Sequence, residues 1–189
     1  MRGMSTLGLL ALSFFQPLAM AVSGGDSKSP SCSITALSQS ALQGGDMAFS
    51  YTVKSHADAA KVWAVWMDVP GWPRWDTELR EARSSVPLAL GVTGTLTPSN
   101  GLPSDFKVTV FEDRHRYAFE TALPMAALTV DRQLRPLADG GTELTHTVSF
   151  TGKRAAEFAT RFAPSFRAAF PRAVAGVARL AEGCVEVKP

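Results

Sequence analysis

Hydrophobic and polar residues alternate in short runs between residues 46 and 152, and this pattern predicts a β-rich domain. The run from Met47 to Val53 has the period of two that is typical of a strand with one buried face. Turn-forming residues separate it from later runs of the same kind. These later runs predict strands at residues 77–86, 92–98, 105–112, 117–123, 127–137 and 142–151.

A helix is predicted over residues 57–67, directly after the first strand. Ser55 and Asp58 have the spacing of a capping box, in which Ser55 is the N-cap and the acid lies three residues further on. Apolar residues at helical spacing follow, and Pro70 with Gly71 ends the helix.

Apolar side chains recur every three or four residues after Gly152, which predicts a C-terminal helix of roughly 30 residues. Pro164 and Pro171 fall within it and are expected to interrupt and kink it. A helix with one continuous apolar stripe needs a large apolar surface to pack against, and a strongly curved antiparallel sheet would supply one. The stripe consists of Phe158, Phe162, Phe166, Phe170, Val174, Val177 and Ala181.

The N-terminus has the features of a secretory leader. Arg2 is a short positive region, residues 6–15 are apolar, and small residues at Ala19 and Ala21 predict cleavage after Ala21. The alternative is an uncleaved membrane anchor, but a bilayer span takes about 20 apolar residues. We therefore expect an exported protein, periplasmic or secreted, without a stable transmembrane anchor.

The length of 189 residues suits one domain with its own core. Residues 1–21 are then the signal peptide. Residues 22–45 form a flexible segment, which is Gly/Ser-rich over residues 22–31 and ends in a turn at Gln43 to Gly45. Residues 46–184 form the single domain, and 185–189 form a tail.

The chain has two cysteines, Cys32 and Cys184, one near each end of the mature protein. In an exported protein an even pair predicts a disulfide, although two unrelated thiols remain the alternative. Neither cysteine has the spacing or histidine partners of a metal site, so no metal is expected.

Charge and motifs narrow the function further. The net charge is +2 and the basic residues are scattered, which gives no footprint for nucleic acid. The sequence contains no nucleophile elbow, zinc-protease motif, phosphate loop or dinucleotide fingerprint, so no cofactor is expected. The sequence defines neither a ligand nor an oligomeric state.

The order of several short motifs resembles the START-related SRPBCC superfamily, and within it the polyketide cyclase/dehydrase and lipid-transport group. Each motif alone is weak, but their order and spacing over about residues 46–182 are specific. The motifs are ADAAKVW at 57–63, DVPGWPRW at 68–75, GVTG at 91–94, LRP at 134–136 and GTELTH at 141–146.

This resemblance implies an α+β helix-grip fold. In that fold a curved antiparallel sheet of six to seven strands wraps a long C-terminal helix, with one or two short helices after the first strand. Members bind lipids, sterols, polyketides or other hydrophobic molecules between the sheet and the helix, and some are enzymes. We therefore expect a hydrophobic or amphipathic small molecule as the partner.

Two polar residues share strand parity with the apolar, inward-facing positions: Arg132 and His146. A buried guanidinium is costly unless it is paired or solvated, so Arg132 suggests a wet cavity or an anionic partner. In one hypothesis Arg132 holds a ligand oxygen and His146 hydrogen-bonds beside it. In the other, Arg132 pairs with an internal acid such as Glu120, or a register slip places both residues outside.

The other candidate contacts are aromatic, and each is either core or cavity wall. The tryptophans gather in and before the Pro/Gly-rich turn after the first helix, where they either seat the helix as a hydrophobic plug or contact a ligand. The aromatic candidates are Trp66, Trp72, Trp75, Phe106, Tyr117, Phe119, Phe158, Phe162 and Phe166.

Three functions remain open at this point. The favoured one is an exported binding protein. A cyclase/dehydratase-type enzyme could use His146 or Arg132 for proton transfer or enolate stabilisation. A non-catalytic interaction protein would have a closed cavity. An enzyme would rest on family analogy alone, so no catalytic residue is assigned.

Overall fold

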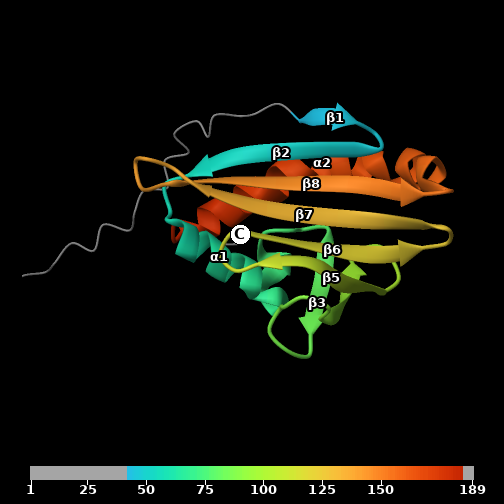
Figure 1. The fold of residues 1–189 in the computed structure, drawn as a ribbon, viewed down its shortest axis with the longest axis horizontal. Coiled ribbons are helices and arrows are strands. Elements are labelled where there is room, and N and C mark those ends of the chain that lie inside the picture. The colour runs from blue at the N-terminus through green and yellow to red at the C-terminus, as the bar shows by residue number, and fades with distance from the viewer. Residues whose placement is uncertain (1–41, 185–189) are drawn as a thin grey trace, which may run out of the picture.

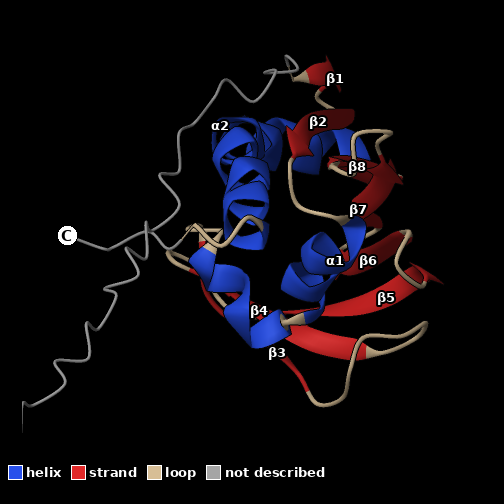
Figure 2. Ribbon diagram, turned by 90° about the vertical axis from the view of Figure 1, so that its left-hand side faces the viewer, coloured by secondary structure: helices blue, strands red, loops and turns tan. Residues whose placement is uncertain are grey.

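Eight antiparallel strands form one curved sheet, and two α-helices lie against its inner face (Figures 1 and 2). This arrangement comes from a computed structural model, which describes residues 42–184. The sheet order is β1-β2-β8-β7-β6-β5-β4-β3. The strands are β1 Gln43–Gly45, β2 Ala48–Ser55, β3 Leu79–Ser84, β4 Thr93–Pro98, β5 Ser104–Glu112, β6 Arg116–Leu123, β7 Ala126–Pro136 and β8 Thr142–Gly152. These elements confirm the predicted α+β helix-grip fold.

The connection from β2 to β3 determines how the inner face is covered. β3 to β8 follow one another as a meander, whereas β2 pairs with β8 and lies near the opposite edge from β3. The chain therefore crosses the inner face between these strands. It does so as helix α1 (Ala59–Met67) and the 3-10 helix η1 (Val69–Arg74), and Figure 2 shows the sheet curving around this segment.

The C-terminal helix α2 (Ala155–Ala181) packs against β2, β8 and α1. Its apolar stripe is largely buried, with Phe162 and Phe166 half-buried. The helix continues through Pro164 and Pro171, so the predicted interruption is wrong. Each proline removes a backbone donor at a cost of about 3 kcal/mol, but burial of the stripe on both sides of each proline holds the helix together.

The start of α1 also differs from the prediction. Asp58 is the N-cap, because its Oδ1 accepts a hydrogen bond of 2.9 Å from the Lys61 N–H. Ser55 instead ends β2, and its hydroxyl donates to the Glu182 carboxylate over 2.8 Å. Ser and Asp are equally good N-caps, so the capping-box spacing alone could not separate them. The predicted capping box is therefore wrong.

The turn predicted at residues 43–45 is also wrong, because these residues form strand β1 and pair with β2. The turn lies one step later, at Asp46 and Met47. Arg167 on α2 donates hydrogen bonds of 3.2 Å to the carbonyl groups of Gly44 and Gly45, which fixes β1 over the helix. This strand raises the sheet to eight strands, from the six to seven expected.

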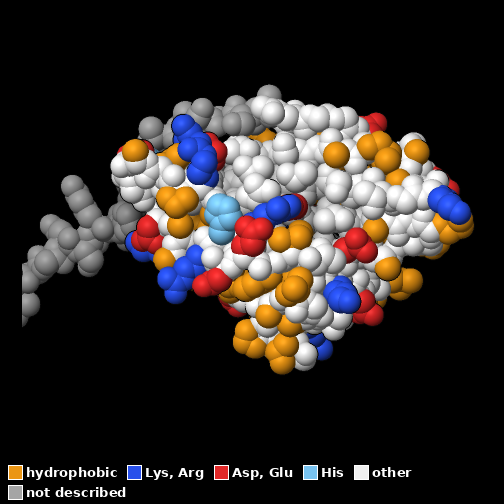
Figure 3. All heavy atoms as spheres, in the orientation of Figure 1, with side chains coloured by type: hydrophobic (Ala, Val, Ile, Leu, Met, Phe, Trp, Pro, Cys, Tyr) orange, Lys and Arg blue, Asp and Glu red, His pale blue; other side chains and the backbone are white. Residues whose placement is uncertain are grey.

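The outer face of the sheet carries interspersed charges of both signs (Figure 3). Arg116 and Asp131 pair across β6 and β7 at 2.6 Å, and Arg135 pairs with Glu143 across β7 and β8 at 2.8 Å. Such cross-strand pairs stabilise the register of a sheet modestly. The inner face carries mostly apolar side chains, with Arg132 and His146 among them.

Several predictions concern residues outside the described range. The leader and Cys32 lie there, so cleavage and the Cys32–Cys184 disulfide stay predictions. Cys184 itself is buried just after α2. Within residues 42–184, none of the helices combines the length and hydropathy needed to cross a membrane.

Gly176 marks the closest approach between α2 and the crossover segment. A Cβ atom at this position would lie 2.9 Å from the backbone oxygen of Trp75 and 3.0 Å from its Cβ. Both atoms belong to a buried, well-packed residue, so they have little freedom to move.

We expect Gly176→Ala to lower the free energy of unfolding by about 1–2 kcal/mol in urea denaturation, because overpacking outweighs the gain in helix propensity. Ala168→Gly is the matched control at an exposed position of the same helix. It should cost about 1 kcal/mol from propensity alone. A Gly176→Ala protein more stable than the wild type would contradict the close packing.

Candidate ligand-binding site

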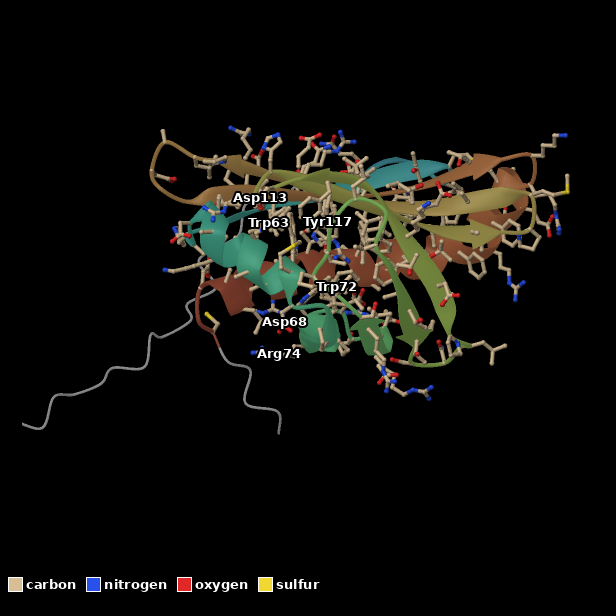
Figure 4. All side chains as sticks on the ribbon, turned by 60° about the horizontal axis from the view of Figure 1, so that its bottom comes forward. Trp63, Asp68, Trp72, Arg74, Asp113 and Tyr117 are labelled. Carbon is tan, nitrogen blue, oxygen red and sulfur yellow. The ribbon has the colours of Figure 1, made fainter. Side chains whose placement is uncertain are left out.

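The Pro/Gly-rich segment after α1 folds as η1 and places Trp72 at the centre of the core. The Trp72 side chain is fully buried, and its Nε1–H donates a hydrogen bond of 2.8 Å to the Trp66 carbonyl. Its ring stacks on Phe106 and Phe119 from the sheet, with centroids 5.8 and 5.6 Å apart. In Figure 4, Trp72 lies between the sheet and the helices with Trp63 and Tyr117, whereas Arg74 lies at the outside.

Arg132 points into this aromatic cluster from β7. Its guanidinium carbon lies 4.5 Å from the ring centroid of Trp72 and 4.7 Å from that of Trp75. Its Nη1 donates a hydrogen bond to the Tyr117 hydroxyl, whereas Nε has no hydrogen-bond partner in the described residues. The side chain is only 3% exposed. Aromatic faces, which attract a desolvated cation, therefore take the place of the acid that sequence reasoning expected as one alternative.

His146 lies directly opposite Arg132 in the pairing of β7 with β8, so both side chains face inward. The imidazole packs on Trp66 at 5.3 Å and on Phe170 at 5.8 Å between ring centroids. Burial, together with the positive charge of Arg132, holds the pKa of His146 well below its usual value. The ring is therefore neutral at physiological pH.

A pocket of about 180 Å³ opens between α2 and the edge of the sheet that carries β3 and β4. Its lining is mostly apolar, and four polar residues, including Ser165 on α2, form its rim. The lining residues are Asp76, Glu78, Leu79, Pro98, Asn100, Phe162, Ser165, Phe166, Ala169, Phe170 and Ala173.

Phe170 separates the pocket from the buried polar residues. It lines the pocket and packs against the His146 ring, which is itself 1% exposed. Trp75, next in the chain to the pocket residue Asp76, covers the Arg132 guanidinium. A molecule in the pocket therefore contacts Phe170 and Asp76, and not Arg132 or His146.

The carboxylate of Asp76 is the least solvated acid of the pocket. Its Oδ1 accepts a hydrogen bond of 3.2 Å from the Glu78 N–H. Burial raises the pKa of Asp76, and the positive charge of Arg132 opposes this effect without cancelling it. The ionised carboxylate is thus disfavoured by the fold.

The structure distributes the aromatic candidates between two places. Phe162 and Phe166 line the pocket, and Phe158 stacks on Phe162 with the centroids 6.0 Å apart. The other candidates pack into the core around Arg132 or His146 rather than along the pocket; they are Trp66, Trp72, Trp75, Phe106, Tyr117 and Phe119. Contact between these aromatic residues and a ligand stays a prediction.

Sequence reasoning missed the polar rim of the pocket. Asp76 and Glu78 follow directly after the tryptophan-rich segment, but nothing in their spacing distinguishes them from exposed loop acids. Phe170 was visible as part of the helix stripe, although its double contact required the folded structure.

The family model described as polyketide cyclase / dehydrase and lipid transport matches residues 47–182. The chain belongs to this family. The match confirms the resemblance seen in the sequence, and it supports a fold that binds small hydrophobic ligands. No curated protein matches the chain in sequence.

Solved structures of family-like proteins share the fold at low sequence identity. A protein from Arthrobacter aurescens has a TM-score of 0.60 at 16% identity, covering 77% of this chain and 95% of that one. A protein from Nitrosomonas europaea has a TM-score of 0.59 at 13% identity, covering 75% and 97%. DynU16, a protein in the dynemicin biosynthetic locus, has a TM-score of 0.56 at 22% identity, covering 73% and 48%.

The neutral, buried His146 predicts a specific loss of stability in acid. Below its ordinary pKa of 6.5 the unfolded chain binds a proton at this histidine, whereas the folded protein does not. The free energy of unfolding should therefore fall by up to about 1.4 kcal/mol for each pH unit below 6.5.

We expect His146→Gln to remove this part of the pH dependence in urea unfolding measured between pH 7 and pH 5. His115→Gln, at an exposed histidine in the turn between β5 and β6, is the control and should follow the wild type. Parallel pH profiles of wild type and His146→Gln would show that His146 takes up its proton in the folded state.

Proposed function

We propose that the chain binds a hydrophobic or amphipathic small molecule in the pocket between α2 and the β3–β4 edge. The observation that carries this proposal is the apolar wall of the pocket, which includes Phe162, Phe166 and Phe170 from a single helix face. Ligand sites are typically apolar clefts with a few polar groups that fix orientation. Membership of a ligand-binding family supports the same conclusion.

The pocket volume limits what can enter without rearrangement. About 180 Å³ is below the usual range for drug-sized ligands. It is close to the apolar cavity of about 150 Å³ that accepts one benzene molecule in another protein. A single ring or a short alkyl chain fits, and a longer molecule would extend past the polar rim into solvent.

Binding is favoured over cyclase or dehydratase chemistry by the positions of the two candidate acid–base residues. General acid–base catalysis requires hydrogen-bond contact with the reacting group. Arg132 and His146 lie behind Trp75 and Phe170 and do not line the pocket.

The proposed site can be tested with benzyl alcohol as the probe and ligand-detected NMR as the measurement. We expect the wild type to bind it, and Ala169→Phe to weaken binding at least about tenfold by filling the pocket. Ala168→Phe is the matched control, one residue away on the exposed side of α2, and should bind normally. Equal binding by the wild type and Ala169→Phe would place the molecule elsewhere and refute the proposed site.

Export is proposed on the leader sequence alone. When the protein is expressed with its leader in a Gram-negative host, we expect it in the periplasm. Its mass, measured by mass spectrometry, should be that of a chain that begins at Val22. Reduction should raise the mass by two hydrogens if Cys32 and Cys184 are bridged. A cytoplasmic product that begins at Met1 would contradict export, whatever the outcome for the pocket.

A further inference from the structure

The polar part of the pocket is acidic. Of its four polar residues, Asp76 and Glu78 are carboxylates, and Asn100 and Ser165 are neutral. Among residues 42–184, the lining includes no lysine, arginine or histidine. A ligand held against the phenylalanine wall therefore meets negative charge at its polar end.

The two carboxylates are not equivalent. Glu78 is 54% exposed and lies 3.5 Å from the Arg172 guanidinium, so solvent and an ion pair both screen its charge. Asp76 is half-buried, and none of its hydrogen bonds within the described residues reaches Oδ2. Asp76 is thus the acid with unused acceptor capacity at the pocket.

The chain retains this carboxylate at a cost to folding. Burial raises the pKa of Asp76, so ionising this carboxyl group costs more in the folded protein than in the unfolded chain. A destabilising ionisable group in a cleft is more often associated with binding or catalysis than with the scaffold.

Because Asp76 lines the pocket and Arg132 does not, Asp76 is the charged residue that a ligand would contact. The charge of Arg132 acts on Asp76, but its guanidinium is covered by Trp72 and Trp75 and does not line the pocket. An anionic ligand would lie beside the Asp76 carboxylate without reaching Arg132. A protonated amine or a hydroxyl would instead donate to Oδ2.

We propose that Asp76 makes the pocket selective for ligands whose polar end donates hydrogen bonds, namely amines and hydroxyls, over ligands that end in a carboxylate. This inference rests on the proposed binding function of the same pocket. The geometry supports it because the apolar wall takes the hydrophobic part and Asp76 receives the donor at the rim.

Three probes with one ring and different polar groups test the selectivity: benzylamine, benzyl alcohol and benzoate, at pH 7 and low salt. In the wild type we expect benzylamine and benzyl alcohol to bind at least about tenfold more tightly than benzoate, since hydrogen bonds to a charged group are the stronger ones. Titrations followed by NMR give the three dissociation constants.

Asp76→Asn should reduce the preference for benzylamine over benzoate at least about fivefold, while benzyl alcohol binding weakens less, because the neutral amide still accepts a hydrogen bond. Glu78→Gln is the matched control and should change the preference less than about twofold, because its charge is screened by solvent and Arg172. Asp76→Ser provides a second variant if the first does not fold.

The outcomes separate this inference from the proposed function. Tighter binding of benzoate than of benzylamine by the wild type overturns the role of Asp76, and this result needs no variant. Unchanged selectivity in Asp76→Asn also overturns it. The binding function still holds in that case if the wild type binds benzyl alcohol and Ala169→Phe weakens this binding. Failure of all three probes to bind the wild type overturns the binding function and the inference with it.

Discussion

The packing of the Arg132 guanidinium on the rings of Trp72 and Trp75 is the contact on which the other layers depend. It joins β7, in the middle of the sheet, to the crossover segment that follows α1. Trp75 then forms the surface on which α2 packs at Gly176. Arg132 and Trp75 thus link the sheet, the crossover segment and the C-terminal helix, which also packs directly on β2 and β8. The pocket lies between that helix and the β3–β4 edge.

The same contact explains how a buried cation is tolerated without an ion pair. Aromatic faces and the Tyr117 hydroxyl replace part of the lost hydration of Arg132. Burial and the charge of Arg132 together lower the pKa of His146, which stays neutral. Burial raises the pKa of Asp76, and the charge of Arg132 partly offsets this effect. Phe170 lies between the pocket and His146. Of the three interacting polar residues Arg132, His146 and Asp76, only Asp76 lines the pocket.

The strands and α2 could be predicted because burial of one face imposes a period of two or of three to four on the sequence. β1 could not, since Gly44 and Gly45 have no side chains to alternate, and Arg167, which holds them, is about 120 residues away in the sequence. The inward direction of Arg132 and His146 followed from strand parity, whereas their partners depended on how η1 folds. The pocket was the least predictable feature, because residues of three separate segments line it.

The pairing of β2 with β8 has a consequence for when the chain can fold. The Thr52 hydroxyl on β2 forms a hydrogen bond with the Thr145 hydroxyl on β8, 93 residues later in the chain. The Ser55 hydroxyl donates a hydrogen bond to the Glu182 carboxylate, just beyond the end of α2. In a newly made chain β2 has only the three-residue strand β1 beside it until nearly the whole domain has been synthesised, and the long-range pairing with β8 is slow. Until then the apolar face of β2 is exposed to solvent, and exposed apolar surface on a strand that awaits its partner favours aggregation during folding.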